Sequence, residues 1–357
     1  MSSSPSTMQA WVYRSKGRPS KVLRLETDYP RPAPSANLVL VKVKAVSLNP
    51  VGWKTMSVPP LSWMQKTPCV PESDVSGIIV EGDLSGTDLQ VGDEVFGIVP
   101  AENVMKTGQG VLAEFALVDK SLLRRKPEAV TFEQAAAVPL AAHTAFFSLI
   151  NEGGLKRQGN EGKKVFINGG SGGVGPFAVQ IATAYGFQVW TTCSPASRSL
   201  VQSLSPSVQI FDYTTSPLHE QLKRHVEEDK KPFDLVFDTV GVQDLYKFSA
   251  SYLSPKGLYA DIAGPHMDGS IKSLIHAASF LMGAMLRPGW AGGVGRKYKF
   301  LWMSTNQENA DEMARMLADG SIKPILDEVF TFEDAKKAYE RSMSGRAKGK
   351  VVIRVSE

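Results

Sequence analysis

The sequence predicts an α/β fold in which a doubly wound parallel sheet is inserted between two parts of a β-rich domain. A glycine-rich turn stands inside a strand–turn–helix–strand pattern at residues 163–194. From Lys163 onward, strand and helix patterns alternate, which is typical of a parallel sheet covered by helices. Before that point, residues 68–97 hold β-branched segments separated by glycines. This pattern favours several short strands in a small twisted barrel.

The first part of the chain is expected to consist mostly of strands. Apolar and β-branched runs predict a short hairpin at residues 8–13 and 22–25, and further strands at 38–46 and 111–118. The 38–46 segment alternates apolar and polar side chains in places, as a half-buried strand does. Thr131 is expected to cap a helix over residues 132–137, which runs into Pro139.

The rest of the chain is expected to build the parallel sheet and then return to the β-rich domain. The strands of the sheet are predicted at residues 165–167, 189–192, 209–211, 235–237, 258–261 and 300–303. A helix over 308–318 follows, and then strands at 325–330 and 351–355 flank a helix over 332–343. Because this last block matches the first part in character, the predicted boundaries are 1–142 with 306–357 for the β-rich domain and 143–305 for the sheet domain.

The glycine-rich turn points to a bound dinucleotide. It fits G-x-G-x-x-G with Gly170, Ser171, Gly172, Gly173, Val174 and Gly175. In such a turn the first glycine allows a tight bend, the second lets backbone N–H groups approach a pyrophosphate, and the third lets helix and strand pack closely. The N-terminus of the following helix would then face the phosphates. A second GGVG at residues 292–295 precedes a basic segment and is predicted to be a loop.

The end of the second strand favours NADPH over NADH. A site for NAD usually has an acidic residue about 20 residues past the glycine turn, where it binds the ribose 2′-hydroxyl. Residues 192–196 hold no acid, whereas Ser194 and Ser197 offer hydroxyl groups and Arg198 offers a guanidinium group suited to a phosphate. The alternative is that Arg198 is only a solvated residue of the next helix.

Composition and charge exclude several classes of protein. In 357 residues, 43% hydrophobic and 21% charged residues are ordinary for a globular chain, and the length favours two domains. The net charge of +4 is spread along the chain, so no nucleic-acid-binding patch is expected. Cys69 and Cys193 cannot form a disulfide framework, nor a zinc site by themselves, which favours a reducing compartment such as the cytoplasm.

No association with a membrane is expected. Residues 1–7 lack the apolar core and the early arginine of a targeting leader. The longest apolar stretch, residues 274–286, is too short to span a bilayer and is interpreted as a buried or interface helix.

Several segments in order resemble the medium-chain dehydrogenase/reductase superfamily, and within it the zinc-free quinone oxidoreductase and enoyl reductase branch. The segments are VSLNPVGWK (46–54), PCVPESDVSGIIV (68–80), VGDEVFG (91–97), FEQAAAVPLAAHTAF (132–146), INGGSGGVGPFAVQIA (167–182), FDTVG (237–241) and GKVVIRV (349–355). INGGSGGVG, LRPGW and RKYKF are also similar to fungal trans-acting enoyl reductases and reticulon-4-interacting-protein-like reductases. The resemblance implies a Rossmann domain plus a GroES-like β-rich catalytic domain.

The same resemblance implies that no metal takes part. In zinc alcohol dehydrogenases of the superfamily, a cysteine would stand at Asn49 and a histidine at Ser73, and a four-cysteine lobe would fall within residues 99–112. Zinc prefers Cys, His or carboxylate ligands, which these positions lack. Without a Lewis acid, reduction of a conjugated C=C bond or a quinone remains feasible, because a few donors can stabilise an enolate oxygen.

Three residues are implied to act near the nicotinamide. Asn49 would donate from its side-chain amide to the substrate or the cofactor, although Asn-Pro is also a common turn pair. Lys54 would reach the nicotinamide ribose or an enolate oxygen, the alternative being an exposed lysine. Thr144 would contact the nicotinamide side, while His143 is interpreted as a core histidine. The family often has aspartate where Gly52 stands, which puts an acid role at that position in doubt.

The resemblance implies further cofactor contacts at Tyr213, at Val240 and Gly241, at Ile262, Ala263 and Gly264, and at Lys350. The tyrosine would lie near the adenosine 2′-phosphate and the valine–glycine pair beside the adenine ribose. The 262–264 segment would offer backbone donors to the nicotinamide carboxamide. The alternatives are a packed aromatic side chain and a solvated lysine. Trp53, Trp63 and Met64 would line a substrate cleft or pack in the core.

The function predicted from these residues is NADPH-dependent, zinc-independent transfer of hydride to a small α,β-unsaturated carbonyl compound or a quinone. Two alternatives stay open: a zinc-free carbonyl or alcohol oxidoreductase, and an NADPH-holding partner or regulator with little turnover. A homodimer that pairs the strand at residues 300–303 is a further expectation from the resemblance.

Overall fold

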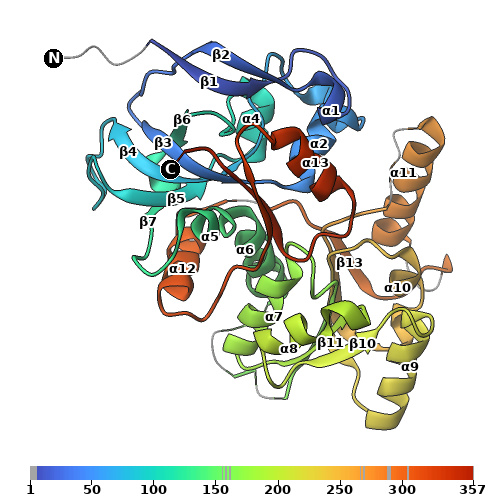
Figure 1. Ribbon diagram of the computed structural model, residues 1–357. Helices are drawn as coiled ribbons and strands as arrows, with labels where there is room; N and C mark the ends of the chain where they lie inside the picture. The colour runs from blue at the N-terminus through green and yellow to red at the C-terminus, as the bar shows by residue number, and fades with distance from the viewer. Residues whose placement is uncertain are drawn as a thin grey trace. The chain divides into compact units, whose positions relative to one another are not determined.

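The computed structural model describes residues 6–154, 156, 159–160, 162–265, 267, 270–287, 291–303 and 305–356. Residues 1–5, on which the expectation about a leader partly rests, and residues 288–290 of LRPGW lie outside the described residues. The chain forms two compact units, Met1–His143 with Thr305–Glu357 (unit 1) and Thr144–Ser304 (unit 2). Figure 1 shows the path of the chain through both.

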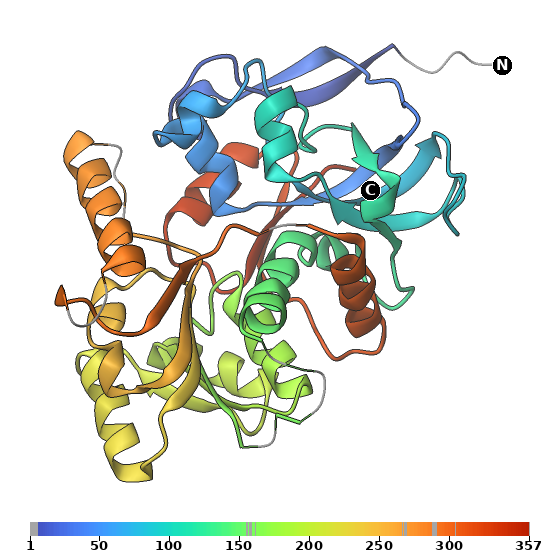
Figure 2. The same cartoon turned by 180° about the vertical axis from the view of Figure 1, so that it is seen from behind.

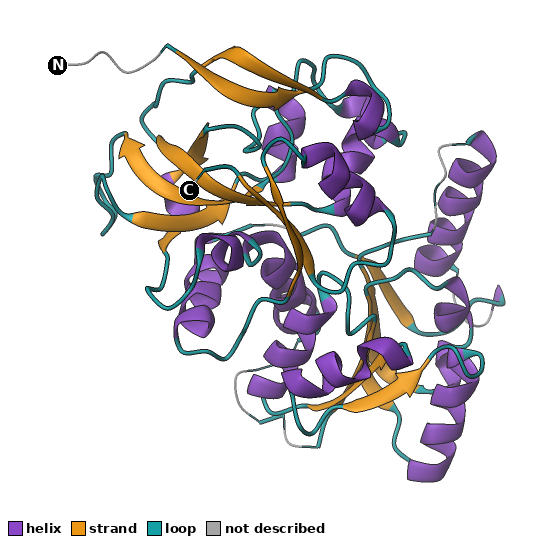
Figure 3. Ribbon diagram, viewed as in Figure 1, coloured by secondary structure: helices purple, strands orange, loops and turns teal. Residues whose placement is uncertain are grey.

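Unit 1 is built on a seven-stranded sheet of order β14-β15-β3-β4-β5-β7, with β6 also paired to β3 and a separate β1–β2 hairpin (Figure 3). Its strands are β1 Thr7–Val12, β2 Arg24–Pro30, β3 Leu38–Ser47, β4 Asp74–Glu81, β5 Glu94–Ile98, β6 Phe115–Asp119, β7 Leu123–Arg125, β14 Leu326–Thr331 and β15 Lys350–Arg354. Its helices are α1 Pro19–Val22, α2 Pro50–Ser57, α3 Leu61–Met64, α4 Ala101–Thr107, α5 Phe132–Ala136, α12 Gln307–Ala318 and α13 Ala335–Met343. Strand β15 pairs antiparallel with β3, so the two ends of the chain share one sheet.

Several predicted elements of unit 1 are confirmed and others shift. The hairpin pairs antiparallel, but its second strand is β2 and Val22 of the predicted 22–25 strand belongs to α1. Thr131 caps α5 through a reciprocal capping box with Gln134. The strand predicted at 111–118 is only β6, because the backbone N–H of Val111 donates out of the ladder to the carbonyl oxygen of Pro71. Helix α13 starts three residues later than predicted, because Phe332 is buried and its carbonyl oxygen accepts from the Trp11 indole.

Unit 2 is an all-parallel six-stranded sheet of order β10-β9-β8-β11-β12-β13. Numbered from its first strand, this order is 3-2-1-4-5-6, as in a Rossmann fold, so the predicted fold class is confirmed. The strands are β8 Lys164–Asn168, β9 Gln188–Cys193, β10 Gln209–Asp212, β11 Phe233–Asp238, β12 Leu253–Asp261 and β13 Lys297–Phe300. The helices are α7 Gly175–Ala184, α8 Arg198–Leu204, α9 Leu218–Asp229, α10 Gln243–Lys247 and α11 Ile271–Leu286, and α6 Pro139–Phe146 crosses between the units. Figures 1 and 2 show α7 and α8 on one face of this sheet, with α9 and α10 on the other.

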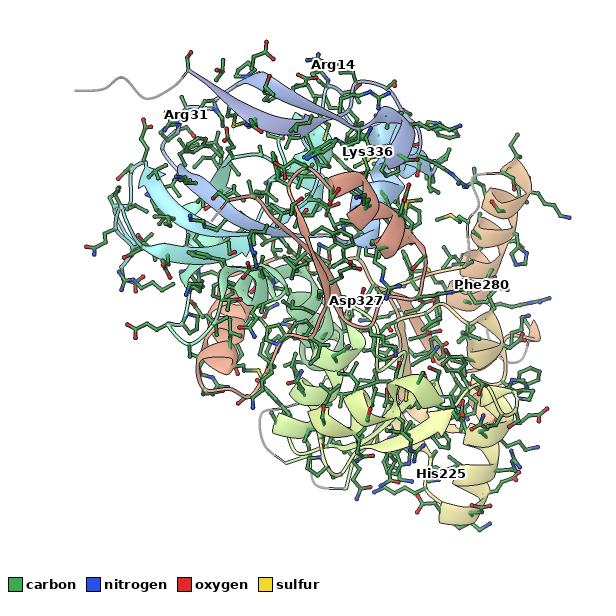
Figure 4. The ribbon with its side chains drawn as sticks, viewed as in Figure 1. Arg14, Arg31, His225, Phe280, Asp327 and Lys336 are labelled. Atoms are coloured by element: carbon green, nitrogen blue, oxygen red, sulfur yellow. The ribbon has the colours of Figure 1, made fainter. Side chains whose placement is uncertain are left out.

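Two predictions for unit 2 are corrected. The strand predicted at 300–303 is β13, because Tyr298 is buried and the ladder with β12 ends at Phe300. Of the two alternatives for the apolar helix, the buried one is wrong, because Met282 and Leu286 of α11 are 63% and 73% exposed, and the interface helix stays a prediction. Phe280 of this helix (labelled in Figure 4) packs on the core of unit 2, where its ring meets those of Tyr246 and Tyr298 edge-on. Residues 292–295 open no helix, as predicted.

Within the described parts of the chain, none of the helices combines the length and the apolar character needed to cross a membrane. Strand β13 is the edge strand of its sheet, and a homodimer formed along it stays a prediction.

Candidate functional site

The glycine turn between β8 and α7 has one open position among tightly packed ones. A Cβ on Gly175 would lie 2.8 Å from the carbonyl carbon of Gly169 and nearer still to its oxygen. A Cβ on Gly170 would lie 2.9 Å from the Cγ2 atom of Thr191 in β9. At Gly172 the nearest atom would be 3.5 Å away, which is ordinary contact. The left-handed backbone that the bend needs is at Gly169, with φ of 91°, so this glycine, which lies before the motif, is the one that makes the bend.

The same turn presents unpaired donors. The Gly172 N–H donates to the Gly169 oxygen, whereas those of Ser171, Gly173 and Val174 have no partner among the described residues. Val174 caps α7 without a side-chain hydrogen bond, so the first turn of the helix keeps its own donors unsatisfied. A phosphate group fits this arrangement, because the helix N-terminus adds a partial positive charge.

The residues predicted to favour NADPH over NADH follow the carboxyl ends of β9 and β10. Arg198 begins α8 and is exposed, Ser194 is half-buried and Ser197 is buried. Tyr213 follows β10 and is 54% exposed, so the alternative of a packed aromatic side chain is wrong. The sequence reasoning missed Asp212, whose pKa is lowered by hydrogen bonds from Thr214 and by the charge of Arg198. An acid therefore does stand within electrostatic reach of Arg198.

Two aspartates shape the loops after β11 and β12. Asp238 accepts from the backbone N–H groups of Val240 and Gly241 at 2.9 and 3.0 Å. Asp261 likewise accepts from Ala263 and Gly264 at 2.9 and 2.8 Å. The N–H of Ile262 donates to the Asp238 carbonyl oxygen. The N–H groups of the 262–264 segment are thus already used within unit 2, so this segment does not offer the free backbone donors predicted for a carboxamide.

A buried polar chain links the strand ends beneath these loops. The Thr192 hydroxyl donates to Asn168 Oδ1, and Asn168 Nδ2 donates to Asp238 Oδ1, both at 2.8 Å. The Tyr259 hydroxyl donates to the other oxygen of Asp238 at 2.8 Å. These residues could have been identified from the sequence, because each polar side chain lies on a strand of a parallel sheet near its carboxyl end, where ligands bind.

Asp261 gives unit 2 a predicted pH dependence. Burial, and secondly the charge of Asp238, raise the pKa of Asp261 from 3.8 to about 6. The folded protein therefore holds a proton that the unfolded chain releases between these values. We expect the free energy of unfolding from this group to fall as pH rises through that window and to level off above it. Urea unfolding at several pH values should show this slope, and Asp261→Asn should flatten it; identical slopes in both proteins would contradict the assignment.

In unit 1 the predicted residues Asn49 and Lys350 meet in a buried cluster. Lys350 Nζ donates to Asn49 Oδ1 at 2.5 Å and lies 3.5 Å from Asp74 Oδ2. Asn49 Nδ2 donates to Asp74 at 2.9 Å and to the Ser47 carbonyl oxygen at 3.2 Å. Both amide protons of Asn49 are therefore engaged, and Lys350 is 4% exposed, so the alternative of a solvated lysine is wrong. Burial lowers the pKa of Lys350 and raises that of Asp74.

Glu72, which sequence reasoning also missed, extends this cluster. Its Oε2 atom accepts from the Asn49 backbone N–H at 3.1 Å, and its Oε1 atom accepts from the Tyr339 hydroxyl at 2.7 Å. Tyr339 lies on α13, which Arg341 fixes to Asp327 of β14 through paired hydrogen bonds of 2.7 and 2.8 Å (Asp327 is labelled in Figure 4). The partners are too far apart in sequence for local spacing to reveal them.

The remaining predicted residues have local partners. Lys54 lies on α2 with its Nζ 5.9 Å from the centre of the Trp53 ring. The Thr144 hydroxyl donates to the Met303 sulfur at 3.5 Å within unit 2. His143 Nδ1 lies 2.8 Å from the Pro139 oxygen, and burial lowers the pKa of this imidazole, which fits the interpretation as a core histidine. Trp63 and Met64 are 71% and 66% exposed, so they do not pack in the core of unit 1.

The donor chemistry of unit 1 differs from that of a zinc site. Asn49 and Ser73, at the positions where zinc alcohol dehydrogenases of the superfamily would have ligands, offer an amide and a hydroxyl group. Among the described residues, no three His, Cys, Asp or Glu side chains gather as metal ligands would. Cys69 and Cys193 are both buried as free thiols, and burial raises the pKa of each.

Comparisons with known proteins identify the family. Residues 35–128 match the alcohol dehydrogenase GroES-like domain, and residues 208–353 match the zinc-binding dehydrogenase family. The chain is 32% identical to the trans-enoyl reductase pgmF of Aspergillus terreus (strain NIH 2624 / FGSC A1156), covering 99% of this chain and 98% of that protein. It is 30% identical to the mitochondrial NAD(P)H oxidoreductase RTN4IP1 of Danio rerio, covering 98% and 92%.

A solved structure agrees with these relatives. The quinone oxidoreductase from Coxiella burnetii superposes with a TM-score of 0.77 at 25% identity, covering 98% of this chain and 99% of that one. Together with the parallel sheet of unit 2 and the GroES-like match in unit 1, these similarities show that the chain belongs to the medium-chain dehydrogenase/reductase superfamily, whose oxidoreductases bind NAD(P).

Proposed function

We propose that the protein is an NADPH-dependent reductase that works without zinc and reduces α,β-unsaturated carbonyl compounds or quinones. The observation that carries the cofactor assignment is the open Gly172 position with its unpaired donors. Residues 192–196, where NAD sites usually have an acid, hold none, and the exposed Arg198 follows them. The substrate class is supported by relatives called trans-enoyl reductases, pgmF and poxH, and by the quinone oxidoreductase from Coxiella burnetii.

Different residues of the chain would bind different parts of the cofactor. The N–H groups of Ser171, Gly173 and Val174 would bind the pyrophosphate, and Arg198 and Tyr213 would hold the 2′-phosphate. NADPH, when bound, supplies a hydride for the electron-poor carbon of the conjugated substrate. The exposed Val240 and the loop held by Asp261 would cover the rest of the cofactor with their apolar and carbonyl groups. The proton that completes the reduction would come from solvent.

In this proposal, zinc independence follows from the side chains at the two positions where zinc ligands would stand. Lys350 and Asp74 already use the polar groups of Asn49, so this residue serves the protein as a hydrogen-bonded anchor. An uncharged amide and a hydroxyl at positions 49 and 73 are poor zinc ligands.

Removal of Arg198 should lower the preference for NADPH. We expect Arg198→Ala to weaken NADPH binding about tenfold or more, because a charge-assisted hydrogen bond contributes about 1.5–3 kcal/mol. NADH binding should change little, since NADH lacks the 2′-phosphate. Nicotinamide fluorescence titration of both cofactors measures this, with Arg224→Ala, an exposed arginine of α9, as the matched control. Equal losses for NADPH and NADH would contradict the assignment.

The proposed reaction is tested by turnover. The purified protein would be offered NADPH with a panel of enones, enoyl thioesters and quinones, and saturated ketones would serve as controls. We expect NADPH oxidation with a conjugated substrate that a metal chelator does not change. Turnover of saturated ketones alone would favour a carbonyl reductase, and tight NADPH binding without any turnover would favour a regulator.

A further inference from the structure

Gly52 of α2 lies directly against the side chain of Glu72. A Cβ built on Gly52 would lie 2.6 Å from the carboxyl carbon of Glu72 and 2.9 Å from Oε2, and closer still to Oε1. Separations of this size are repulsive, so no side chain fits at position 52 while Glu72 is in place. The carboxyl group of Glu72 therefore occupies the space into which a side chain at position 52 would project.

Glu72 reaches this space from an unusual backbone conformation. Its φ is 71°, in the left-handed region that residues other than glycine rarely adopt. The side chain is nonetheless 3% exposed and hydrogen-bonded at both oxygens, to the Asn49 backbone and to Tyr339. A backbone outlier kept in place by such contacts is often found at a functional position.

We propose that Gly52 and Glu72 form one functional pair, in which Glu72 supplies from the loop before β4 the carboxyl group that an aspartate at position 52 would otherwise supply. Glu72 is a positioning residue in this assignment. It holds the Asn49 backbone and the start of α2, where the nicotinamide-facing residues were predicted. The expected effect on turnover rests on the proposed reductase function. The competition of the Glu72 carboxyl group with any side chain at position 52 for the same space rests on the fold alone.

The surroundings of Glu72 favour an uncharged carboxyl group. Burial is the main cause that raises the pKa of Glu72 to about 8, and the charge of Asp74 adds to it, whereas Tyr339 and Lys350 oppose it. The other titratable groups that act on this cluster are Tyr13 and Cys69, and burial raises the pKa of both. The hydrogen bonds that Glu72 accepts from the Tyr339 hydroxyl and from the Asn49 N–H favour the charged carboxylate, but the effect of burial outweighs them.

The pair is tested by exchanging the two residues in the full chain. The proteins are Glu72→Gly, Gly52→Asp, the double variant with both changes, and Glu72→Gln. We expect Glu72→Gly to lower kcat/KM about tenfold, because Asn49 and Tyr339 lose a shared partner. Gly52→Asp alone should lower the thermal midpoint sharply, because its side chain collides with Glu72. The double variant should recover most of both losses.

The controls distinguish a specific rescue of Gly52→Asp by Glu72→Gly from a general gain in stability when the left-handed Glu72 is replaced by glycine. A Cβ on Gly110 would lie 2.5 Å from the backbone oxygen of Glu72, which remains after Glu72→Gly. Gly110→Asp should therefore be destabilised as Gly52→Asp is, but not rescued by Glu72→Gly. Because the pKa of Glu72 is raised to about 8, we expect the pH profile of kcat in the wild-type protein to show a step near pH 8. Glu72→Gln keeps the shape of the side chain, so it should fold normally and lack this step.

The outcomes distinguish this inference from the proposed function. If the double variant is no more stable than Gly52→Asp, or if Glu72→Gln keeps the wild-type pH profile, the pairing is overturned. If the wild-type protein turns over no substrate, the proposed function fails, and the thermal midpoints of the same variants still decide the pairing. Failure of Glu72→Gly to fold would leave the decision to the double variant, which supports the pairing if it folds and contradicts it if it does not.

Discussion

Replacing Gly175 with alanine is expected to destabilise unit 2 by about 3 kcal/mol and to abolish dinucleotide binding. The added Cβ would meet the carbonyl group of Gly169 and, at 2.9 Å, the Cα atom of Gly170. All three atoms belong to the backbone of the turn, so no side chain can rotate away. The start of α7 must therefore move away from β8, and the unpaired donors lose their arrangement. Urea unfolding and NADPH titration measure both effects.

Gly172→Ala is the matched control for this prediction. Its Cβ would be 3.5 Å from the nearest atom and its φ is not positive, so the fold should tolerate the change. We expect the stability of Gly172→Ala to stay within about 1 kcal/mol of the wild type. We expect NADPH binding to weaken, because the methyl group would take up space proposed for the pyrophosphate. Equal stability of the two variants would contradict this account of the turn.

Removing the charge of Lys350 is expected to be the most destabilising change in unit 1. Lys350→Met keeps the length of the side chain but leaves Asp74, which is 0% exposed, without its cation. The loss of one partner from a buried ion pair costs about 3–5 kcal/mol. It would also leave Asn49 Oδ1 without its donor, so the start of α2 should loosen. The free energy of unfolding in urea measures the loss.

The double variant Lys350→Met with Asp74→Asn tests the electrostatic cause. It buries no uncompensated charge, so it should recover a large part of the lost stability. A double variant as unstable as Lys350→Met would show that packing, and not charge, explains the effect.

The fold of unit 2 was predictable because its signals are local. A glycine turn between a strand and a helix, followed by alternating elements, determines the parallel sheet and its ligand-binding edge. The strand limits were less certain where residues on both sides of the boundary are similar, and so β13 lies three residues before its predicted position. The sequence could not decide between a buried and an interface helix at α11, because the apolar residues are alike in both and only the neighbouring elements determine which face is covered.

The candidate site in unit 1 was predictable only in part. Asn49 and Lys350 were found through resemblance, but their partners Glu72, Asp74 and Tyr339 come from segments that the fold brings together over as many as 301 residues. Gly52 was noted as a departure from the family pattern. The sequence could not show why position 52 needs a glycine. The carboxyl group that fills the space beside Gly52 belongs to Glu72, whose left-handed backbone conformation cannot be predicted from a sequence pattern.

The most direct test of the proposed function is label transfer during turnover. The protein, treated with a chelator, would reduce an α,β-unsaturated carbonyl compound with NADPH deuterated at the transferable position of its nicotinamide ring. We predict one deuterium at the β-carbon of a saturated carbonyl product, with the hydrogen at the α-carbon drawn from solvent. Deuterium at the carbonyl carbon of an alcohol product, or reduction of neither the α,β-unsaturated carbonyl compound nor a quinone, would contradict the proposal.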